Sequence, residues 1–234
     1  KLTLEALSKG LRVEHLLVTQ EYFDLGLSEA LLKELSPRPA LMDELTVVPD
    51  VLFRELVTTT SPSPVLAAAA MPVVTIEMLL ARQAATLVLC ENLQDPGNLG
   101  TIIRSALAFD AGALILSHGS VDAFNPKVVR SAMGGLFQLP ILSIDLEIAC
   151  RHLKEAGYVF LAFSPEAKIT TADYPFTEEK VILLVGNEGN GLTERAEALA
   201  DVKISIPQNA AVESLNVAVA TSIALYARAM AQKR

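Results

Sequence analysis

Three segments in the last 150 residues of the chain place Asn, Gly, Glu or Ser directly after apolar stretches. They are DPGNLGTIIR (95–104), VGNEGNGL (185–192) and VESLNVAVA (212–220). Apolar runs typical of buried strands precede them: TLVLC (86–90), VILLV (181–185) and KISIP (203–207). Ligands of open α/β sheets bind in crevices at the carboxyl ends of strands. The three segments therefore predict one shared pocket lined by amides, backbone groups and a carboxylate.

Each segment also has a simpler structural interpretation when it is taken alone. Asn98 stands where a helix N-cap is expected, which would leave Arg104 facing solvent. Glu188 could be a solvated residue in a glycine-rich turn, and Ser214 could cap the last helix. The sequence contains neither GxxxxGK[ST] nor GxGxxG, so it has no P-loop and no dinucleotide-binding fingerprint.

The order and spacing of the segments are far more specific than any one of them. Together they resemble the SpoU (TrmH-like) RNA 2′-O-ribose methyltransferases of the SPOUT superfamily. The shared pattern is an Asn six residues before an Arg, then Gly-x-Glu-x-x-Gly after a strand, then Ser-Leu-Asn-Val opening the last helix. The matching residues are Asn98, Arg104, Gly186, Glu188, Gly191, Ser214, Leu215, Asn216 and Val217. The resemblance covers roughly residues 85–230 and includes the stretch 125–140.

This resemblance implies a fold, a cofactor and a quaternary structure. The fold would be an α/β parallel-sheet domain with a C-terminal trefoil knot. The cofactor would be S-adenosylmethionine, contacted by Gly186, Ile206 and Leu215. The family dimerises through this domain, so each active site would borrow residues from its neighbour. The residues expected to act in catalysis are Arg104, Asn98, Glu188, Ser214 and Asn216.

The implied reaction is an in-line transfer of a methyl group from a sulfonium to a ribose 2′-hydroxyl. Because the sulfonium is already activated, positioning supplies much of the catalysis. We expect Arg104 to orient the adjacent RNA phosphate and to favour the developing alkoxide, since a guanidinium rarely gives up its proton to act as a general base. Asn98 and Asn216 would position Arg104 or the ribose, and Ser214 and Glu188 would complete the polar network.

Composition limits the kind of partner. The net charge of −8 argues against a broadly basic surface that coats nucleic acid, so RNA binding would require a local patch such as Arg104, Lys127 and Arg130. The two cysteines, Cys90 and Cys150, form no CxxC pair, and we expect inert core thiols and no metal. We expect a reducing compartment, the cytoplasm or alternatively an organelle. No apolar run approaches the ~18 residues of a transmembrane helix, so no membrane association is expected.

Strand and helix patterns divide the chain into two parts. Residues 1–71 resemble, more weakly, the small α/β substrate-binding domain of many family members, with a truncated start. A linker at 72–84, containing a short helix, would lead to the catalytic domain at 85–234. Strands are predicted at 15–19, 45–48, 65–70, 86–93, 113–117, 137–143, 158–164, 181–185 and 203–207. Helices are predicted at 28–35, 99–110, from 125, 146–156, 193–200 and 215–230.

Several functions remain open at this point. The accessory N-terminal domain favours ribosomal RNA as substrate over transfer RNA. A non-catalytic RNA-binding homologue is an alternative, although the five intact polar residues of the three segments argue against it. A small-molecule methyltransferase or another nucleotide-binding α/β enzyme is a third possibility, and the separate N-terminal module speaks for a macromolecular substrate instead.

Overall fold

The computed structural model describes residues 1–57, 59, 62–209, 211–212 and 214–232. Glu213, within the third polar segment, lies outside the described residues. The chain divides into two compact units, Lys1–Val73 and Val74–Arg234. None of the described helices is long and apolar enough to cross a membrane.

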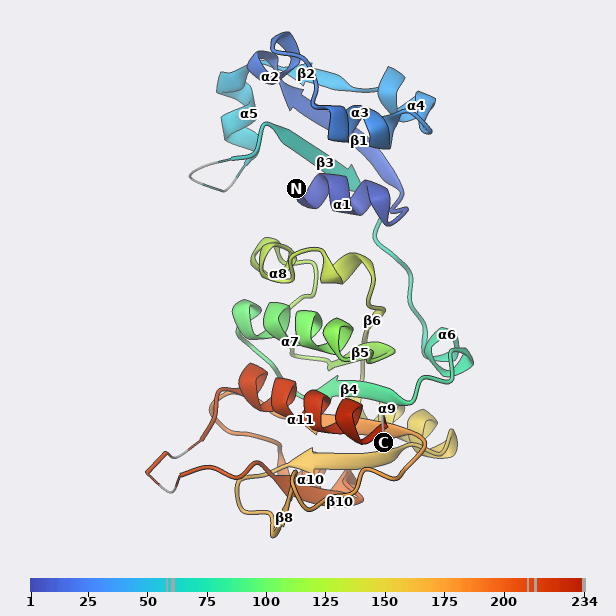
Figure 1. Cartoon of the computed structure of the whole chain (residues 1–234), viewed down its shortest axis with the longest axis vertical. Coiled ribbons are helices and arrows are strands. Elements are labelled where there is room, and N and C mark those ends of the chain that lie inside the picture. The colour runs from blue at the N-terminus through green and yellow to red at the C-terminus, as the bar shows by residue number, and fades with distance from the viewer. Residues whose placement is uncertain (58, 60–61, 210, 213, 233–234) are drawn as a thin grey trace. The chain divides into compact units, whose positions relative to one another are not determined.

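The first unit is a three-stranded sheet in the order β2-β1-β3, with helices packed on it (Figure 1). Its strands are β1 (Val13–Thr19), β2 (Thr46–Val48) and β3 (Val65–Ala69); β1 runs parallel to β2 and antiparallel to β3. Its helices are α1 (Leu2–Ser8), α2 (Gln20–Asp24), α3 (Glu29–Leu35), α4 (Pro39–Asp43) and α5 (Asp50–Leu56). Ser28 caps α3 as predicted, because its side chain accepts the N–H of Leu31. The sequence did not predict α2, α4 and α5, which have five to seven residues and too few turns to show a helical period.

The second unit is built on a seven-stranded sheet in the order β6-β5-β4-β9-β7-β10-β8, and every neighbouring pair in it is parallel. The strands are β4 (Thr86–Cys90), β5 (Ala113–Ser117), β6 (Ile141–Ile144), β7 (Val159–Phe163), β8 (Ile169–Thr170), β9 (Val181–Val185) and β10 (Val202–Ser205). Cys90 pairs with Val185, so β4 and β9 end level with each other at the carboxyl edge. The α/β fold with a parallel sheet is therefore confirmed.

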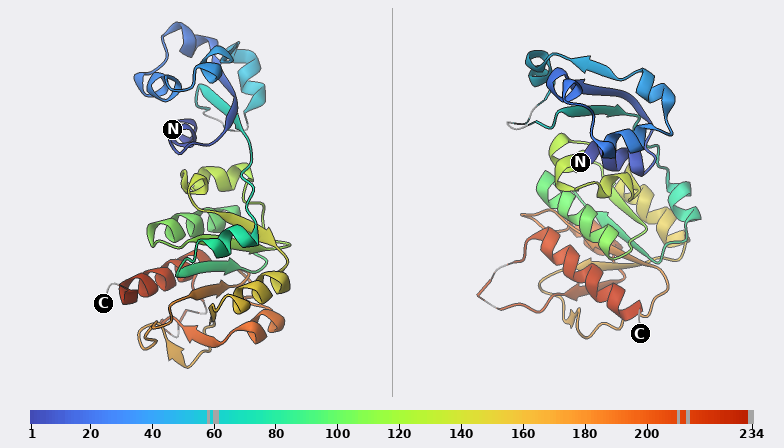
Figure 2. Two further views of the ribbon diagram at one scale, coloured as in Figure 1. Left: turned by 90° about the vertical axis from the view of Figure 1, so that its right-hand side faces the viewer. Right: turned by 45° about the horizontal axis from the view of Figure 1, so that its top comes forward.

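Helices cover both faces of this sheet (Figures 1 and 2). The helices α7 (Pro96–Ala108), α8 (Pro126–Ser131) and α11 (Val217–Gln232) pack on one face; α6 (Ile76–Ala81), α9 (Leu146–Glu155) and α10 (Glu194–Leu199) pack on the other. Alternate residues of β4 face opposite cores: Val88 and Cys90 point to the α7 side, and Leu87 and Leu89 to the α9 side. Burial on both faces explains why the strands read as continuous apolar runs.

The predicted strand at 137–143 is wrong in its first half. The backbone of Gly134 takes a left-handed φ of 86°, and the chain then forms a 3₁₀ turn at Gly135–Phe137 before β6 begins at Ile141. Leu136 and Leu139 are nevertheless buried in the core. Buried apolar residues of a turn give the same sequence pattern as a buried strand, which explains the wrong prediction.

Two further features of the second unit come from buried side chains. Cys90 and Cys150 are free and buried, as predicted, and burial raises the pKa of both thiols. Arg228 of α11 is only 2% exposed and donates to the backbone carbonyls of Phe176 (2.6 Å) and Glu178 (2.7 Å). The C-terminal helix is thereby joined to the segment that leads into β9.

Candidate functional site

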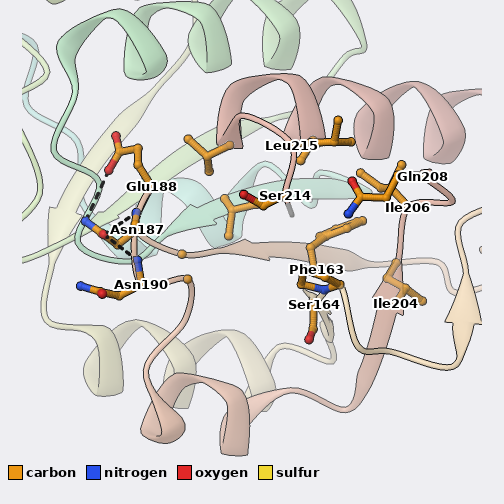
Figure 3. Close-up of a pocket in the computed structure, with 17 residues that line it drawn as sticks. Phe163, Ser164, Asn187, Glu188, Asn190, Ile204, Ile206, Gln208, Ser214 and Leu215 are labelled. Atoms are coloured by element: carbon orange, nitrogen blue, oxygen red, sulfur yellow. Dashed lines mark hydrogen bonds between the residues drawn. The ribbon is translucent and has the colours of Figure 1, made fainter. Parts of the chain in front are cut away.

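A pocket of about 340 Å³ lies at the carboxyl edge of the sheet in the second unit (Figure 3). It is bounded by the ends of β7, β9 and β10 and by the segment that enters α11. Phe163, Ile206 and Leu215 gather at one end of it, and Asn187, Glu188 and Asn190 at the other. Such a mixture of apolar walls and a few polar groups is typical of sites for small organic ligands.

The glycine-rich loop after β9 forms one wall of the pocket. It folds back on itself, because Asn187 and Gly191 exchange two backbone hydrogen bonds of 2.8 and 3.0 Å. The side chain of Asn187 closes the turn by accepting the N–H of Gly189 and of Asn190. A Cβ at Gly186 would lie 2.1 Å from the carbonyl carbon of Gly191, so the loop can be this tight only with glycine there.

Asp95 is the N-cap of α7, and the prediction that Asn98 fills this position is wrong. The Oδ1 atom of Asp95 accepts the N–H of Asn98 at 2.8 Å, and Pro96 occupies the first helical position. Proline fixes φ at a helical value, so the helix starts three residues earlier than expected. The side chain of Asn98 is consequently free for other contacts.

Asn98 connects the three polar segments to one another. Its Nδ2 donates to Oε1 of Glu188 at 3.1 Å, and its Oδ1 accepts Nδ2 of Asn216 at 2.9 Å. Asn216 in turn accepts the N–H groups of Ala218 and Val219 at the start of α11. Donors and acceptors alternate along this chain, so the orientation of both amides is fixed.

Glu188 acts here as a hydrogen-bond acceptor. Its carboxylate accepts the N–H of Asp95 at 2.8 Å and that of Gln94 at 3.2 Å, in addition to the amide of Asn98. Burial raises the pKa of Glu188, but these hydrogen bonds outweigh that effect and the pKa lies below its ordinary value. The side chain is therefore ionised at neutral pH, and its role is to hold the glycine loop against the start of α7.

Asn216 caps α11, so the alternative interpretation in which Ser214 caps this helix is wrong. The helix begins at Val217, and Asn216 is the residue whose side chain accepts its first N–H groups. Ser214 instead lines the pocket beside Leu215 (Figure 3).

The basic residues lie apart from this cluster. Arg104 is exposed on α7 and is not among the residues that line the pocket. Six residues separate it from Asn98, which corresponds to about 9 Å along the helix and about 240° around it. Lys127 is nearer, with Nζ 3.9 Å from Oδ2 of Asp95, and Arg130 is exposed on α8. The structure thus brings together the predicted amide, carboxylate and pocket residues and leaves Arg104 on another face of the helix.

Sequence reasoning missed several residues of the site. Phe163 and Gln208 line the pocket from segments with no motif, and their position depends on the strand order, which periodicity does not reveal. Asn187 donates to the carbonyl of Asn92 at 2.9 Å. Its place directly after Gly186 in a glycine-rich turn was the only available signal. Among the described residues, no group of three or more His, Cys, Asp or Glu is arranged to hold a metal ion.

An all-parallel sheet with a pocket at its carboxyl edge defines the class: an α/β protein whose pocket, lined by apolar side chains, amides and backbone groups, suits a small organic ligand. A model of the SpoU rRNA Methylase family matches residues 85–226. The chain belongs to this family, which confirms the resemblance drawn from the three segments.

Individual relatives are named for the methylation of ribosomal RNA. Over 195 residues the chain is 31% identical to the 23S rRNA (uridine(2479)-2'-O)-methyltransferase of Streptomyces viridochromogenes, covering 81% of this chain and 68% of that protein. Over 143 residues it is 37% identical to the 23S rRNA (guanosine(2553)-2'-O)-methyltransferase RlmP of Bacillus subtilis, covering 61% of this chain and 57% of that protein. The SpoU methyltransferase AviRb of Streptomyces viridochromogenes in complex with the cofactor AdoMet aligns with a TM-score of 0.83 and 28% identity, covering 100% of this chain and 89% of that one.

Proposed function

We propose that this protein is an S-adenosylmethionine-dependent RNA 2′-O-ribose methyltransferase that acts on ribosomal RNA. The observation that carries the proposal is the hydrogen-bonded chain Glu188–Asn98–Asn216, which joins the three family segments beside one pocket. The names of the relatives given above support the substrate class.

The pocket fits the cofactor by its chemistry. Ile206 and Leu215 offer apolar contact, and Gly186, which has no side chain, lets its backbone line the pocket directly. When bound, S-adenosylmethionine supplies a methyl group on an activated sulfonium. Gln208 and the backbone groups of the glycine loop would provide hydrogen bonds to the cofactor.

Asn98, Asn216 and Ser214 would position the ribose at this edge of the sheet, and Glu188 would hold the loops that carry them. Arg104 would orient the RNA phosphate next to the reacting hydroxyl and stabilise negative charge that develops on it. Since Glu188 is ionised and its oxygens are already engaged, it is a poor candidate for a proton donor. Most of the catalysis is then positioning.

We propose a homodimer as the active form. The outer surfaces of α7 and α11 expose Leu107, Val219, Tyr226 and Met230, and the ring of Tyr226 packs on Phe109 with centroids 5.8 Å apart. A second copy would cover this apolar surface, and α7 also carries Arg104. In such an arrangement Arg104 would serve the pocket of the neighbouring protomer. Light scattering tests the dimer, and a monomer at micromolar concentration would contradict it.

The first unit, approximately residues 1–71, is proposed to bind RNA outside the methylation site. Arg12, His15 and Arg38 line one hollow of that unit. Lys127 and Arg130 of α8 would add phosphate contacts in the second unit. Substituting Arg12 or Lys127 with Glu should weaken RNA binding and reduce its dependence on salt, because each phosphate contact releases counterions.

A trefoil knot is proposed for the C-terminal segment. In the sheet β10 lies between β7 and β8; the chain then returns to the pocket at Leu215 before α11 packs on α7. Ser105 and Ser222 are hydrogen-bonded at 2.7 Å across these two helices. A crystal structure that traces the chain through this region would test the threading.

The decisive experiment is methyl transfer from labelled S-adenosylmethionine to total RNA by the wild type and by Arg104→Ala, followed by nuclease mapping of the label. Label on a ribose 2′-oxygen of ribosomal RNA, lost in the variant, is the expected result. Label on transfer RNA instead would show that transfer RNA, and not ribosomal RNA, is the substrate. Cofactor binding without any transfer would favour a non-catalytic RNA-binding homologue, and no cofactor binding would overturn the proposal.

A further inference from the structure

Glu91 is a buried acidic residue that the proposed mechanism leaves without a role. It follows Cys90 directly and is 7% exposed, on the same side of the sheet as Leu87 and Leu89. Among the salt bridges of the described residues, none involves Glu91. A buried carboxylate without a cation is costly unless hydrogen bonds compensate for lost water, so its partners identify its role.

Those partners are the two ends of the glycine-rich loop. The N–H of Glu91 donates to the carbonyl of Val185 at 2.8 Å, where the loop begins. The carboxylate accepts the N–H of Thr193 at 2.8 Å and the hydroxyl of Thr193 at 2.7 Å, where the loop ends. One residue therefore holds both ends of the segment 186–192, of which residues 186–191 line the pocket.

Thr193 uses its hydroxyl twice. It donates to Glu91 and accepts the N–H of Ala196 at 3.1 Å, which makes it the N-cap of α10. The hydroxyl makes both bonds at once, because its proton points to the carboxylate and a lone pair accepts from the helix. Glu91 thus fixes the rotation of this side chain and, through it, the point at which loop becomes helix.

The loop needs this restraint because it contains three glycines. Glycine loses more conformational freedom on ordering than any other residue, so an unrestrained loop would sample many shapes. On the α7 side, Asn187 and Glu188 attach the loop to residues 92–95. Glu91 supplies the attachment on the opposite, α9 side.

We infer that Glu91 is a positioning residue for the cofactor pocket: by holding Val185 and Thr193 it orders the glycine loop and so sets cofactor affinity, without touching the cofactor. Glu91 is absent from the residues that line the pocket. The inference rests on the proposed function, in which the ligand of this pocket is S-adenosylmethionine. Glu91 then restrains the loop from the α9 side, as Glu188 does from the α7 side.

The test compares Glu91→Gln and Thr193→Val with Thr193→Ser, which keeps the hydroxyl. Calorimetry with S-adenosylmethionine should show binding weakened by about 10-fold in the first two variants and restored in Thr193→Ser. In steady-state kinetics KM for the cofactor should rise while kcat at saturation changes by less than about threefold.

Asp201→Asn is the matched control. Asp201 also accepts a backbone N–H, that of Phe160 at 2.8 Å, and it immediately precedes β10, whereas Glu91 follows the end of β4. This variant should lower the melting temperature and leave the dissociation constant unchanged. If Glu91→Gln behaves in the same way, Glu91 is only structural and the inference is overturned.

Hydrogen exchange of the ligand-free protein separates this inference from the proposed function. Faster exchange of the amides at 187–193 in Glu91→Gln than in the wild type is expected whatever the ligand is. Unchanged exchange there would overturn the positioning role. Failure of the wild type to bind S-adenosylmethionine, with faster exchange in the variant, would refute the proposed function and leave the restraint of the loop standing.

Discussion

The side-chain amide of Asn216 donates a hydrogen bond to Oδ1 of Asn98 over 2.9 Å, joining residues 118 positions apart in the chain. Since Nδ2 of Asn98 donates to Glu188, neither amide can turn over without losing a partner. This pair therefore links the start of α7, the glycine loop and the start of α11 in one defined geometry.

Replacing Asn98 with Asp should break that geometry. The new carboxylate would face the ionised carboxylate of Glu188 at the distance of a hydrogen bond, and the two charges repel. We expect kcat to fall on the order of 100-fold, because small displacements of positioning groups cost about that much. Binding of S-adenosylmethionine should also weaken, because Glu188 holds the glycine loop that lines the pocket. A variant that methylates RNA at the wild-type rate would remove Asn98 from the site.

Gly186→Ala should abolish a functional pocket. The added Cβ would collide with the backbone of Gly191, so the loop must open, and cofactor binding should weaken by about 100-fold. Gly189→Ala is the matched control in the same loop. Its Cβ would meet only Oδ1 of Asn187 at 3.6 Å, an ordinary contact. Equal loss of calorimetric binding in both variants would mean that the loop tolerates no side chain at all.

Arg228→Met should destabilise the protein by about 3 kcal/mol, because the carbonyls of Phe176 and Glu178 would lose their buried donor. The midpoint of urea unfolding measures the change. Arg151→Met on the exposed surface of α9 is the control and should stay within about 0.5 kcal/mol. A comparable shift in both variants would show that loss of charge, and not of these hydrogen bonds, is responsible.

Glu188 should contribute to the acid dependence of stability. Its pKa in the folded protein lies below the ordinary value of 4.5, so the unfolded chain takes up its proton first as the pH falls. The stabilisation is fully present above that value and disappears as the pH drops through the folded-state pKa. The wild type should therefore exceed Glu188→Gln in free energy of unfolding at pH 7, and the difference should shrink below about pH 4.5. A difference that stays constant from pH 7 to pH 3 would contradict this assignment.

The sequence predicts the strands well where both faces are buried. The runs at β4, β5 and β9 are buried at every position, so an uninterrupted apolar run is their expected form. It does not predict which strands are neighbours. β4 lies beside β9 in the sheet, although four strands and several helices separate them in the chain. No local sequence pattern encodes such a pairing.

The site was predictable in composition but not in hydrogen bonding. Asn98, Glu188 and Asn216 do meet, as a motif at the carboxyl edge implies. Which residue caps each helix depends on the backbone, and Pro96 moved the start of α7. Glu91 is an acidic residue at the end of an apolar run, which in the sequence suggests a solvated side chain. The structure shows instead that its carboxylate accepts two hydrogen bonds from Thr193.

The side of the pocket formed by the segment that enters α11 is the last part of the site to be synthesised. Ser214, Leu215 and Asn216 follow all seven strands in the chain, and a ribosome makes the N-terminal parts first, at roughly 5–20 residues per second. A nascent chain that has completed β10 therefore carries the whole sheet and still has an open-sided site. A chain that ended after Ser205 would lack both the Ser214–Asn216 side of the pocket and α11, whose Ala218, Ala224 and Leu225 belong to the buried core on one face of the sheet.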